Sequence, residues 1–178
     1  MIKTNKDELL IGLISDTHVP DRTTMISDTI INDLKKKKID YLFHLGDFSN
    51  FETFKSIISI FGKDKVIGVR GNTDLDGKLK EILPEQLEFE LYDRKIFMTH
   101  GTGGPNMILK RLCKRFDVFK YDILIFGHTH RPLNEKKNNT LFINPGTTTP
   151  IDNKFTVVSS YGFLKISQTK VEFTIKYL

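Results

Sequence analysis

The sequence predicts an α/β fold in which two mixed β-sheets pack face to face and helices cover the outside. Two observations predict it. Short apolar runs rich in β-branched residues recur along the chain, and amphipathic segments with helical spacing lie between several of them. The C-terminal part is instead rich in short strands that favour antiparallel pairing. Two mixed sheets accommodate both kinds of strand.

Five apolar, β-branched runs are predicted to be buried parallel strands. They cover residues 10–14, 41–45, 66–69, 96–98 and 123–126. A short polar block follows or closes each run, and the blocks are spaced by roughly 30 residues, which is the length of one strand–helix–strand unit. Open α/β sheets place their ligand sites at the carboxyl ends of neighbouring strands. We therefore expect the polar blocks to converge.

Amphipathic spacing predicts a helix over residues 21–38, whose apolar residues are Ile26, Ile30 and Leu34. A second helix can be capped by Asn50 and ended by Gly62. Its apolar stripe comprises Phe54, Ile57, Ile58 and Phe61.

A glycine-rich segment, Gly101-Thr102-Gly103-Gly104-Pro105, leads into a third predicted helix. Proline favours the first helical turn, so Pro105 is expected there. The apolar face of this helix comprises Met107, Ile108, Leu112 and Phe116. Backbone N–H groups near Gly101 could contact a phosphate oxygen. The segment lacks the lysine and the full spacing of a P-loop, and a mobile hinge is the alternative interpretation.

The remaining strands are predicted to pair antiparallel. Residues 87–91 alternate apolar and charged side chains, turn at residues 92–94 and return through the strand at 96–98. Further strands are expected at residues 140–143, 155–160, 163–167 and 171–177.

The composition is that of one globular domain: the chain has 178 residues, of which 39% are hydrophobic and 28% charged. We expect residues 1–8 to be a flexible leader and residues 9–178 to form the domain. The single cysteine, Cys113, excludes an internal disulfide. No apolar run is long enough to cross a membrane and no signal pattern opens the chain, so we expect a cytoplasmic protein without membrane contact.

The net charge of +5 comes largely from lysines at residues 35–38 and 136–137. The first group falls at the C-terminal end of a predicted helix, where cations complement the helix dipole. A solvated helix end is therefore favoured over a nucleic-acid surface. A positive field would still attract a phosphate anion.

The polar blocks contain all five histidines and the carboxylates that could join them around metal ions. They are Asp16-Thr17-His18, His44-Leu45-Gly46-Asp47, Gly71-Asn72-Thr73-Asp74, Thr99-His100-Gly101 and Gly127-His128-Thr129-His130. Imidazoles and carboxylates that meet in one crevice bury unpaired charge unless a cation lies between them. The blocks therefore predict a metal site.

Seven side chains are candidate ligands: Asp16, His18, Asp47, Asn72, His100, His128 and His130. One catalytic ion needs fewer. Two ions that share a bridging carboxylate fit this number better. Such pairs suit displacement at phosphorus, because one ion can carry the attacking hydroxide while both neutralise charge on the equatorial oxygens.

The ordered pattern Asp-x-His, Gly-Asp, Gly-Asn, His-Gly and Gly-His-x-His resembles the calcineurin-like metallophosphoesterase superfamily, and within it the small single-domain phosphodiesterases of bacteria and archaea. The later segment Asn144-Pro145-Gly146-Thr147 resembles a turn of this subfamily, so the resemblance covers nearly the whole chain. It implies a four-layer αββα sandwich. It also implies that Asp47 bridges two metals, whose remaining ligands are Asp16, His18 and His130 for the first and Asn72, His100 and His128 for the second.

The chain departs from many larger members of the superfamily after its Gly-Asn pair. Those members have a histidine there that is thought to assist the leaving group, whereas this chain has Thr73 followed by Asp74. The small phosphodiesterases also lack that histidine, so the departure narrows the subfamily. A threonine hydroxyl cannot donate a proton near neutral pH as an imidazolium can. We therefore expect better turnover of esters with acidic leaving groups.

Three further residues near the predicted site, His44, Asp74 and Arg70, are not among the candidate metal ligands. His44 is expected to pack behind the ligands, because the family pattern does not use it as a ligand. Asp74 could contact the metals through water or stabilise its turn. Arg70 could bind phosphate, although a structural salt bridge is favoured because it precedes the turn. Gly101 and Asn72 are expected to contact the substrate.

The predicted function is hydrolysis of a small phosphodiester by a metal-bridged hydroxide at a dinuclear site, with Asp47, Asn72, Thr73 and Asp74 as the catalytic candidates. Nitrogen and oxygen ligands favour manganese, with nickel, iron, cobalt or zinc as alternatives. One rival hypothesis is a non-catalytic protein-binding scaffold like the retromer subunit of this fold. A second is a nuclease like the members that repair double-strand breaks. Nucleic acid is not the expected partner, and exposed edge strands make a homodimer conceivable.

Overall fold

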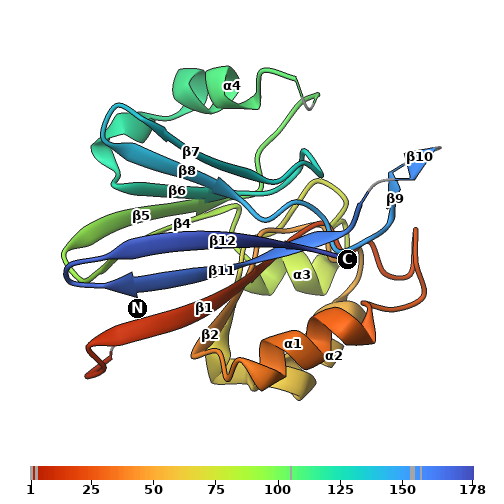
Figure 1. The fold of residues 1–178 in the computed structure, drawn as a ribbon. Coiled ribbons are helices and arrows are strands. Elements are labelled where there is room, and N and C mark those ends of the chain that lie inside the picture. The colour runs from red at the N-terminus through yellow and green to blue at the C-terminus, as the bar shows by residue number, and fades with distance from the viewer. Residues whose placement is uncertain (1, 3, 105, 153–154, 157) are drawn as a thin grey trace.

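The structure of this protein is a computed structural model that describes residues 2, 4–104, 106–152, 155–156 and 158–178. Two five-stranded sheets pack face to face, with helices on both outer sides (Figure 1). From top to bottom in that view, the layers are helix α4, one sheet, the other sheet, and helices α1 and α2. The predicted fold class, an α/β four-layer sandwich, is confirmed.

The first sheet has the strand order β12-β11-β1-β2-β3. Its strands are β1 (Glu8–Ile14), β2 (Tyr41–His44), β3 (Val66–Gly68), β11 (Ser160–Ser167) and β12 (Val171–Tyr177). Strands β1, β2 and β3 are parallel, whereas β11 pairs antiparallel with both β1 and β12. This sheet is therefore mixed, as predicted.

The second sheet has the strand order β4-β5-β6-β8-β7. Its strands are β4 (Gln86–Leu91), β5 (Arg94–Thr99), β6 (Ile123–Phe126), β7 (Leu133–Lys137) and β8 (Thr140–Asn144). Strands β5, β6 and β8 are parallel, and each edge strand pairs antiparallel with its neighbour. A separate pair comprises β9 (Ile151–Asp152) and β10 (Phe155–Thr156).

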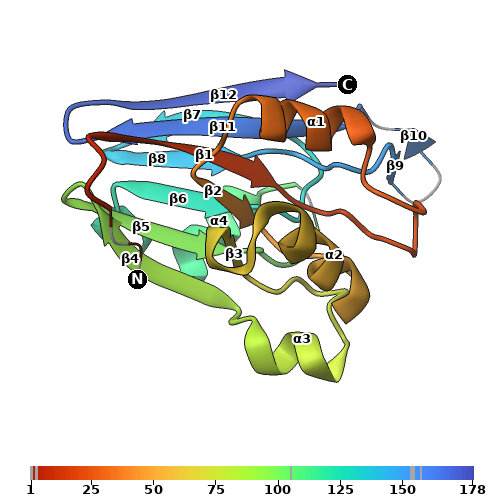
Figure 2. The ribbon, with the colours of Figure 1, turned by 90° about the horizontal axis from the view of Figure 1, so that it is seen from below.

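The helices are α1 (Asp28–Lys36), α2 (Phe51–Phe61), α3 (Gly77–Ile82) and α4 (Ile108–Arg115), with short 3-10 turns at Lys63–Lys65 and Val118–Lys120. Figure 2 shows α1 and α2 beside one another on the outer face of the first sheet, and α3 on the connection from β3 to β4. That connection carries the chain from the first sheet to the second. No helix in the described part of the chain is long and apolar enough to span a bilayer.

Three apolar layers hold the sandwich together, because successive residues of a strand face opposite sides of its sheet. In β2, Phe43 lies between the two sheets and Leu42 packs under α1 and α2. In β6, Ile125 lies between the sheets and Leu124 packs under α4. Both strands are therefore apolar on both faces, which is why their sequences read as continuous apolar runs.

The helix predicted over residues 21–38 is shorter than expected. It begins at Asp28, because the Ser27 hydroxyl accepts a hydrogen bond of 3.3 Å from the N–H of Thr29 and caps the helix. Ile26 precedes α1, yet it packs against the same apolar layer. The predicted helix was therefore too long, because Ile26 lies in a loop but has the spacing of a helical core residue. The cap at Asn50 and the end at Gly62 of α2 are confirmed.

The helix predicted after the glycine-rich segment also starts later. Met107 has a left-handed φ of 61° and is 63% exposed, so it does not belong to the apolar face. Ile108 and Leu112 of α4 are buried, and Phe116 packs just after the helix. Pro105 lies outside the described residues.

Besides the 3-10 turns, three elements were not predicted, namely α3, β7 and the two-residue strand β9. Helix α3 has six residues and buries only Leu79, which is too little for a periodic pattern. Strand β7 is a polar edge strand that exposes four of its five residues, so no alternation marks it. The strand expected at residues 155–160 includes residue 157, which is not described. Within that range, β10 ends at Thr156 and β11 begins at Ser160.

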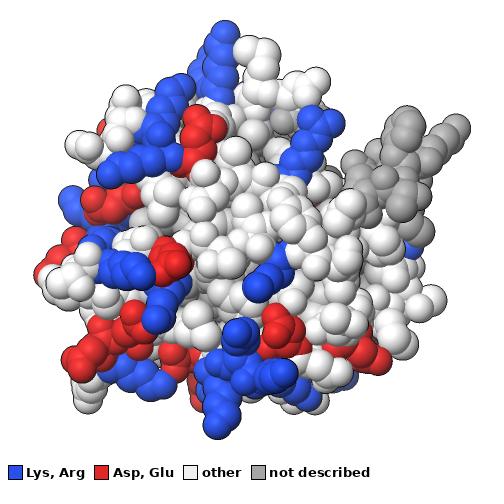
Figure 3. Space-filling model, viewed as in Figure 1, with Lys and Arg blue, Asp and Glu red and all other residues white. Residues whose placement is uncertain are grey.

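Basic and acidic side chains are mixed on the face that Figure 3 shows. Lys and Arg side chains are interspersed with Asp and Glu over the left and lower parts of this view, and much of the rest of the visible face is uncharged. Lys35 and Lys36 lie in the last turn of α1, as predicted. This face therefore offers no continuous basic stripe of the kind that follows a nucleic-acid backbone.

Tyr161 on β11 links helix α1 to the first sheet through a hydrogen bond. Its hydroxyl donates a hydrogen bond of 2.7 Å to the Asp33 carboxylate, and the tyrosine is 5% exposed. Burial, reinforced by the bond to Asp33, raises the pKa of Tyr161 to about 12. The protonated phenol is therefore the form that the fold stabilises.

Replacing Tyr161 by Phe should lower the free energy of unfolding by about 1 kcal/mol at neutral pH. The difference from the unmodified protein should persist up to the ordinary tyrosine pKa of 10 and vanish as the pH rises through about 12, where the native phenol ionises. Urea unfolding of both proteins across this range measures it. Tyr177→Phe, at a position 62% exposed, is the control and should change little. Equal stability of Tyr161→Phe and the unmodified protein at pH 7 would contradict the assignment.

Candidate metal centre

The polar blocks that follow the parallel strands of both sheets meet at one end of the sandwich. Backbone hydrogen bonds join them: Asp16 N–H donates to the Gly46 carbonyl at 2.9 Å, and His18 N–H donates to the Asp47 carbonyl at 3.0 Å. Across the two sheets, the His100 ring donates from Nδ1 to the Leu45 carbonyl at 2.6 Å. The convergence expected from the sequence is therefore present, although it involves two sheets and not one.

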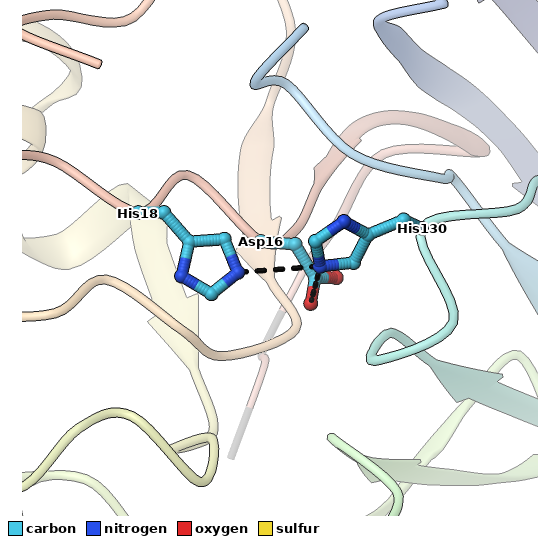
Figure 4. A group of neighbouring side chains, drawn as sticks. All are labelled: Asp16, His18 and His130. Carbon is cyan, nitrogen blue, oxygen red and sulfur yellow. Dashed lines mark hydrogen bonds and ion pairs between the residues drawn. The ribbon is translucent and has the colours of Figure 1, made fainter. Parts of the chain in front are cut away.

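One group of donor atoms comprises Asp16, His18 and His130, which come from the loops after β1 and β6 (Figure 4). The Nε2 atoms of His18 and His130 are 3.2 Å apart. Nε2 of His130 is also 3.2 Å from Oδ1 of Asp16. These three residues are the set that the family resemblance implies for the first metal.

A second group comprises Asp16, Asp47 and His100. Oδ2 of Asp47 lies 3.4 Å from Nε2 of His100 and 3.5 Å from Nε2 of His18. Asp47 therefore stands between the two histidines that the resemblance gives to different metals. Asp16 belongs to both groups, because its Oδ1 also lies 3.9 Å from Nε2 of His100.

His128 and Asn72 lie beside the second group. The Nε2 of His128 contacts the Gly103 carbonyl, and a carbonyl can only accept, so this nitrogen carries the hydrogen. Nδ1 of His128 is then an acceptor, and it lies 3.2 Å from Nε2 of His100. Asn72 is exposed and lines the same cavity as His100.

The charges of the cluster favour a cation at its centre. Burial would lower the pKa of His100, but the carboxylates of Asp16 and Asp47 outweigh it and raise this pKa to about 9. Burial would likewise raise the pKa of both aspartates, yet the neighbouring histidines lower it. Burial lowers the pKa of His18 and His128, so their rings are neutral donors of a lone pair.

These residues fit divalent metal ions. Oδ1 of Asp16 is buried and accepts no hydrogen bond from a described residue, although imidazole nitrogens lie around it. A buried carboxylate oxygen without a donor is costly unless a cation meets it. Imidazole nitrogen and carboxylate oxygen are the donors that manganese, iron, cobalt, nickel and zinc accept.

The backbone at the centre is strained. Five of the seven predicted ligands have left-handed φ angles, between 47° and 70°, which non-glycine residues rarely adopt. They are Asp16, His18, Asp47, His128 and His130. Such strain persists only where the surroundings enforce it, and it clusters at functional sites. The tight loops thereby turn alternate side chains of each block toward one point.

Two glycines allow the loops to approach one another. A Cβ at Gly71 would lie 2.1 Å from Oδ1 of Asp47, and a Cβ at Gly127 would lie 2.0 Å from the Ser15 hydroxyl. Any side chain at either position would displace a loop that carries predicted ligands. Glycine is therefore required in the Gly-Asn and Gly-His pairs because neighbouring loops leave no room for a Cβ.

The segment 144–147 ties the loops of the two sheets together. The Asn144 amide donates to the Gly127 carbonyl at 2.8 Å and to the Thr129 hydroxyl at 3.1 Å. The Thr147 hydroxyl donates to the Asp16 carbonyl at 2.8 Å. The sequence marked this segment only through its resemblance to a family turn, and the structure supplies the physical role.

Asp74 stabilises two loops with its carboxylate. One oxygen accepts the N–H groups of Asp47 at 2.9 Å and Gly71 at 2.6 Å, and the other accepts the N–H of Ser49 at 2.9 Å. The residue is 1% exposed. Of the two roles that the sequence left open, these contacts favour stabilisation of the turn. Thr73 contributes through its backbone, because its N–H donates to Oδ1 of Asp47 at 2.9 Å.

His44 packs behind the cluster. Its ring stacks on Phe48 with centroids 3.5 Å apart, and its Nδ1 accepts the N–H of Gly46 at 3.2 Å. Nε2 therefore carries the hydrogen and faces the Thr17 hydroxyl at 3.3 Å. Burial lowers the pKa of His44 to about 3, so the ring is neutral. Both nitrogens are engaged, as expected of a packed histidine.

The three predicted substrate contacts, Arg70, Asn72 and Gly101, line one cavity of about 300 Å³, and the buried His100 also lies in its wall. Arg70 forms an ion pair of 2.6 Å with Glu85, which is the structural salt bridge that the sequence favoured. Sequence reasoning missed other residues that line the cavity, among them Leu75, Lys80, Leu112, Arg115 and Phe116. No local motif marks these residues, because they come from α3 and α4 and the turns beside them.

Sequence reasoning also missed two groups that orient ligands. The Ser15 hydroxyl donates to Oδ2 of Asp16, and the Gly103 carbonyl fixes the ring of His128. Ser15 adjoins the first block, and a serine beside a buried aspartate is a signal that could have found it. The Gly103 carbonyl belongs to the backbone and leaves no signal in the side chains.

Comparison with known proteins places the chain among phosphoesterases. The calcineurin-like phosphoesterase superfamily domain matches residues 9–169. A probable metallophosphoesterase of Methanocaldococcus jannaschii is 35% identical over 146 residues, which cover 79% of this chain and 69% of that protein. A phosphodiesterase of the same archaeon is 32% identical over 148 residues, which cover 76% of this chain and 82% of that protein.

Among solved structures, Vps29 of Entamoeba histolytica complexed with Zn²⁺ has a TM-score of 0.76 at 23% identity. The match covers 96% of this chain and 98% of that chain. At this identity the likeness shows the fold alone.

Replacing Asp74 by Ala should lower the free energy of unfolding by roughly 2 to 4 kcal/mol, because three N–H groups lose a charged acceptor. Asp74→Asn keeps one acceptor oxygen and should lose less. Urea unfolding measures both. Asp64→Ala removes an exposed carboxylate next to α2 and is the control, with an expected change near zero. An Asp74→Ala variant as stable as Asp64→Ala would refute the role of this carboxylate.

Proposed function

The chain belongs to the calcineurin-like phosphoesterase superfamily, and we propose that it is a phosphodiesterase that hydrolyses a small phosphodiester at a dinuclear metal centre. The observation that carries this proposal is the position of Asp47, whose Oδ2 lies within 3.5 Å of histidines from both predicted ligand sets. A carboxylate so placed can serve two ions at once. Relatives named metallophosphoesterase and phosphodiesterase support the reaction class.

In this proposal the ligands divide as the family pattern implies. Asp16, His18 and His130 hold one ion, Asn72, His100 and His128 hold the other, and Asp47 serves both. Divalent ions bound there would activate a water molecule and neutralise charge that develops on the phosphoryl oxygens. The nitrogen and oxygen donors favour manganese, with nickel, iron, cobalt and zinc as the alternatives.

The protein's own groups would orient the ligands and receive the substrate. Hydrogen bonds to the Leu45 and Gly103 carbonyls aim the rings of His100 and His128. Asn72 stands at the cavity wall, where its amide can contact a phosphoryl oxygen. The departing oxygen would be stabilised by a metal, by solvent or weakly by Thr73, which supplies a hydroxyl and not an imidazolium.

The scaffold hypothesis fits less well than the enzyme hypothesis. The Vps29 structure shares the fold at 23% identity, whereas the relatives named as enzymes reach 35% and 32%. All seven predicted ligands are present in this chain. A small diester is also preferred over DNA as the substrate, because this chain has Thr73 after its Gly-Asn pair and not the histidine of the larger members. We further propose a cytoplasmic location.

Replacing Asp47 by Asn or His128 by Ala should reduce manganese-dependent turnover of bis(p-nitrophenyl) phosphate by at least about 100-fold, since the first change removes the charged bridging carboxylate and the second removes an imidazole ligand. Bound manganese, measured by atomic absorption after gel filtration, should fall in parallel while circular dichroism is retained. Asp64→Asn is a matched control on the surface and should leave both values unchanged. Full activity in either site variant would disprove the ligand assignment.

Aryl diesters should be hydrolysed faster than alkyl diesters. A general acid contributes about 10²- to 10⁴-fold to such reactions, and its absence penalises poor leaving groups. The matched substrates are thymidine 5′-(p-nitrophenyl phosphate) and thymidine 5′-(methyl phosphate), and we expect a difference in kcat of at least about 100-fold. Thr73→His should narrow this difference by raising the alkyl rate. Equal rates on both substrates with the unmodified protein would count against the prediction.

A further inference from the structure

The cavity beside the metal centre carries more positive charge than one scissile phosphodiester requires. Its walls include His100 and Asn72 from the centre and three cations, Arg70, Lys80 and Arg115. The proposed metals and Asn72 suffice to receive the phosphate that is cleaved. The three cations come from the loop after β3, from α3 and from the end of α4, so three separate elements bring positive charge to the lining of this cavity.

Carboxylates offset this charge only in part. Glu85 lies 2.6 Å from Arg70 and 3.9 Å from Arg115, so one carboxylate serves two guanidinium groups. Asp74 also lines the cavity, but its oxygens accept backbone N–H groups. Lys80 has no ion pair with any carboxylate in the described part of the chain. The cavity therefore retains positive charge that a bound anion could neutralise.

An apolar surface lies next to these cations. Leu112 is buried, and the Phe116 ring packs against Phe97 with centroids 4.9 Å apart. The Arg115 guanidinium lies 5.3 Å from the centroid of the Phe116 ring. Arginine held over an aromatic ring presents its N–H groups in a fixed plane, which suits a phosphate better than a mobile lysine does. The apolar wall suits a sugar or a base.

We infer that the substrate of this cavity is a phosphodiester that carries a second, terminal phosphate, such as a 5′-phosphorylated dinucleotide. This inference rests on the proposed function. The scissile phosphate lies at the metal centre, and the terminal phosphate is bound by Arg115, Lys80 and Arg70 in competition with Glu85. Water adds its oxygen to the scissile phosphorus, the bond to the 3′ oxygen breaks, and that oxygen takes up a proton that the water releases. The dinucleotide pApA thus gives two molecules of AMP.

The kinetic test compares pApA with ApA, which differ only in the terminal phosphate. With the manganese-loaded protein, kcat/KM for pApA should exceed that for ApA by at least about tenfold. The preference should shrink as salt rises from about 0.05 to 0.5 M, because exposed charges are screened. Cleavage of both substrates without a preference would overturn the inference while leaving the proposed function intact.

Substitutions around the cavity should move the pApA/ApA ratio in opposite directions. Arg115→Ala and Lys80→Ala should lower it several-fold toward one, because each removes a cation that binds the terminal phosphate. Glu85→Gln should raise it, because it frees two arginines from a competing carboxylate. Lys114→Ala removes the neighbouring charge of α4 outside the cavity lining and should leave the ratio unchanged. A Glu85→Gln variant with a lowered ratio would contradict the inference.

A binding measurement tests the same cavity without catalysis. AMP titrated into ¹⁵N-labelled, metal-free protein should shift the amide resonances of Lys80, Arg115 and Phe116, and Arg115→Ala should weaken the apparent affinity several-fold. Absence of shifts at these residues would overturn the inference. If neither dinucleotide is cleaved but AMP binds as described, the anion site stands and the proposed phosphodiesterase function fails.

Discussion

Two buried carboxylates, Asp16 and Asp47, determine how the rest of this molecule is arranged. Neither is more than 2% exposed, and each lies within 4 Å of more than one imidazole. Buried carboxylates without compensation would destabilise the fold by several kcal/mol each. The histidines compensate part of this cost, and Oδ1 of Asp16 accepts no hydrogen bond within the described part of the chain. The cluster is therefore a place where the protein keeps negative charge available for a cation.

The surrounding structure enforces this arrangement through the backbone. Asp74 accepts amide hydrogens from the loop of Asp47, and the Thr147 hydroxyl binds the loop of Asp16. Left-handed backbone at most of the predicted ligands costs energy, and these contacts offset it. Both sheets contribute, because the blocks after β1 and β2 meet those after β5 and β6. Rigid strands on two sides give the donors a precision that a single loop would lack.

The sequence predicted the architecture well wherever a residue pattern had a single physical cause. The apolar runs at 41–45 and 123–126 became strands buried on both faces, and the glycines at 71 and 127 mark loops in close contact. Prediction failed where a residue outside a helix matched the helical spacing, or where a helix buried too few residues to show that spacing. Ile26 lies in a loop but has the spacing of a helical core position, and α3 buries too few side chains to show an apolar period.

The candidate site likewise has residues that the sequence could predict and residues that it could not. The side chains that meet at the cluster were predictable, because imidazoles and carboxylates placed after buried strands have few other uses. The roles of Asp74 and His44 were not, since only the geometry shows that all their polar atoms are already engaged. The cavity wall formed by α3 and α4 was equally hidden, because residues such as Lys80 and Arg115 meet only through tertiary folding.

The edge strands carry a consequence for how copies of this chain could associate. Strand β4 bears Glu88 and Glu90, β7 bears Glu135, Lys136 and Lys137, and β12 bears Glu172 and Lys176. A foreign strand added at any of these borders would have to strip water from several ionic groups, so open-ended ribbon growth is disfavoured. The fourth edge strand, β3, has no charged residue but is only three residues long, so it offers little length for pairing. Crowded solutions of the protein should therefore resist fibre formation.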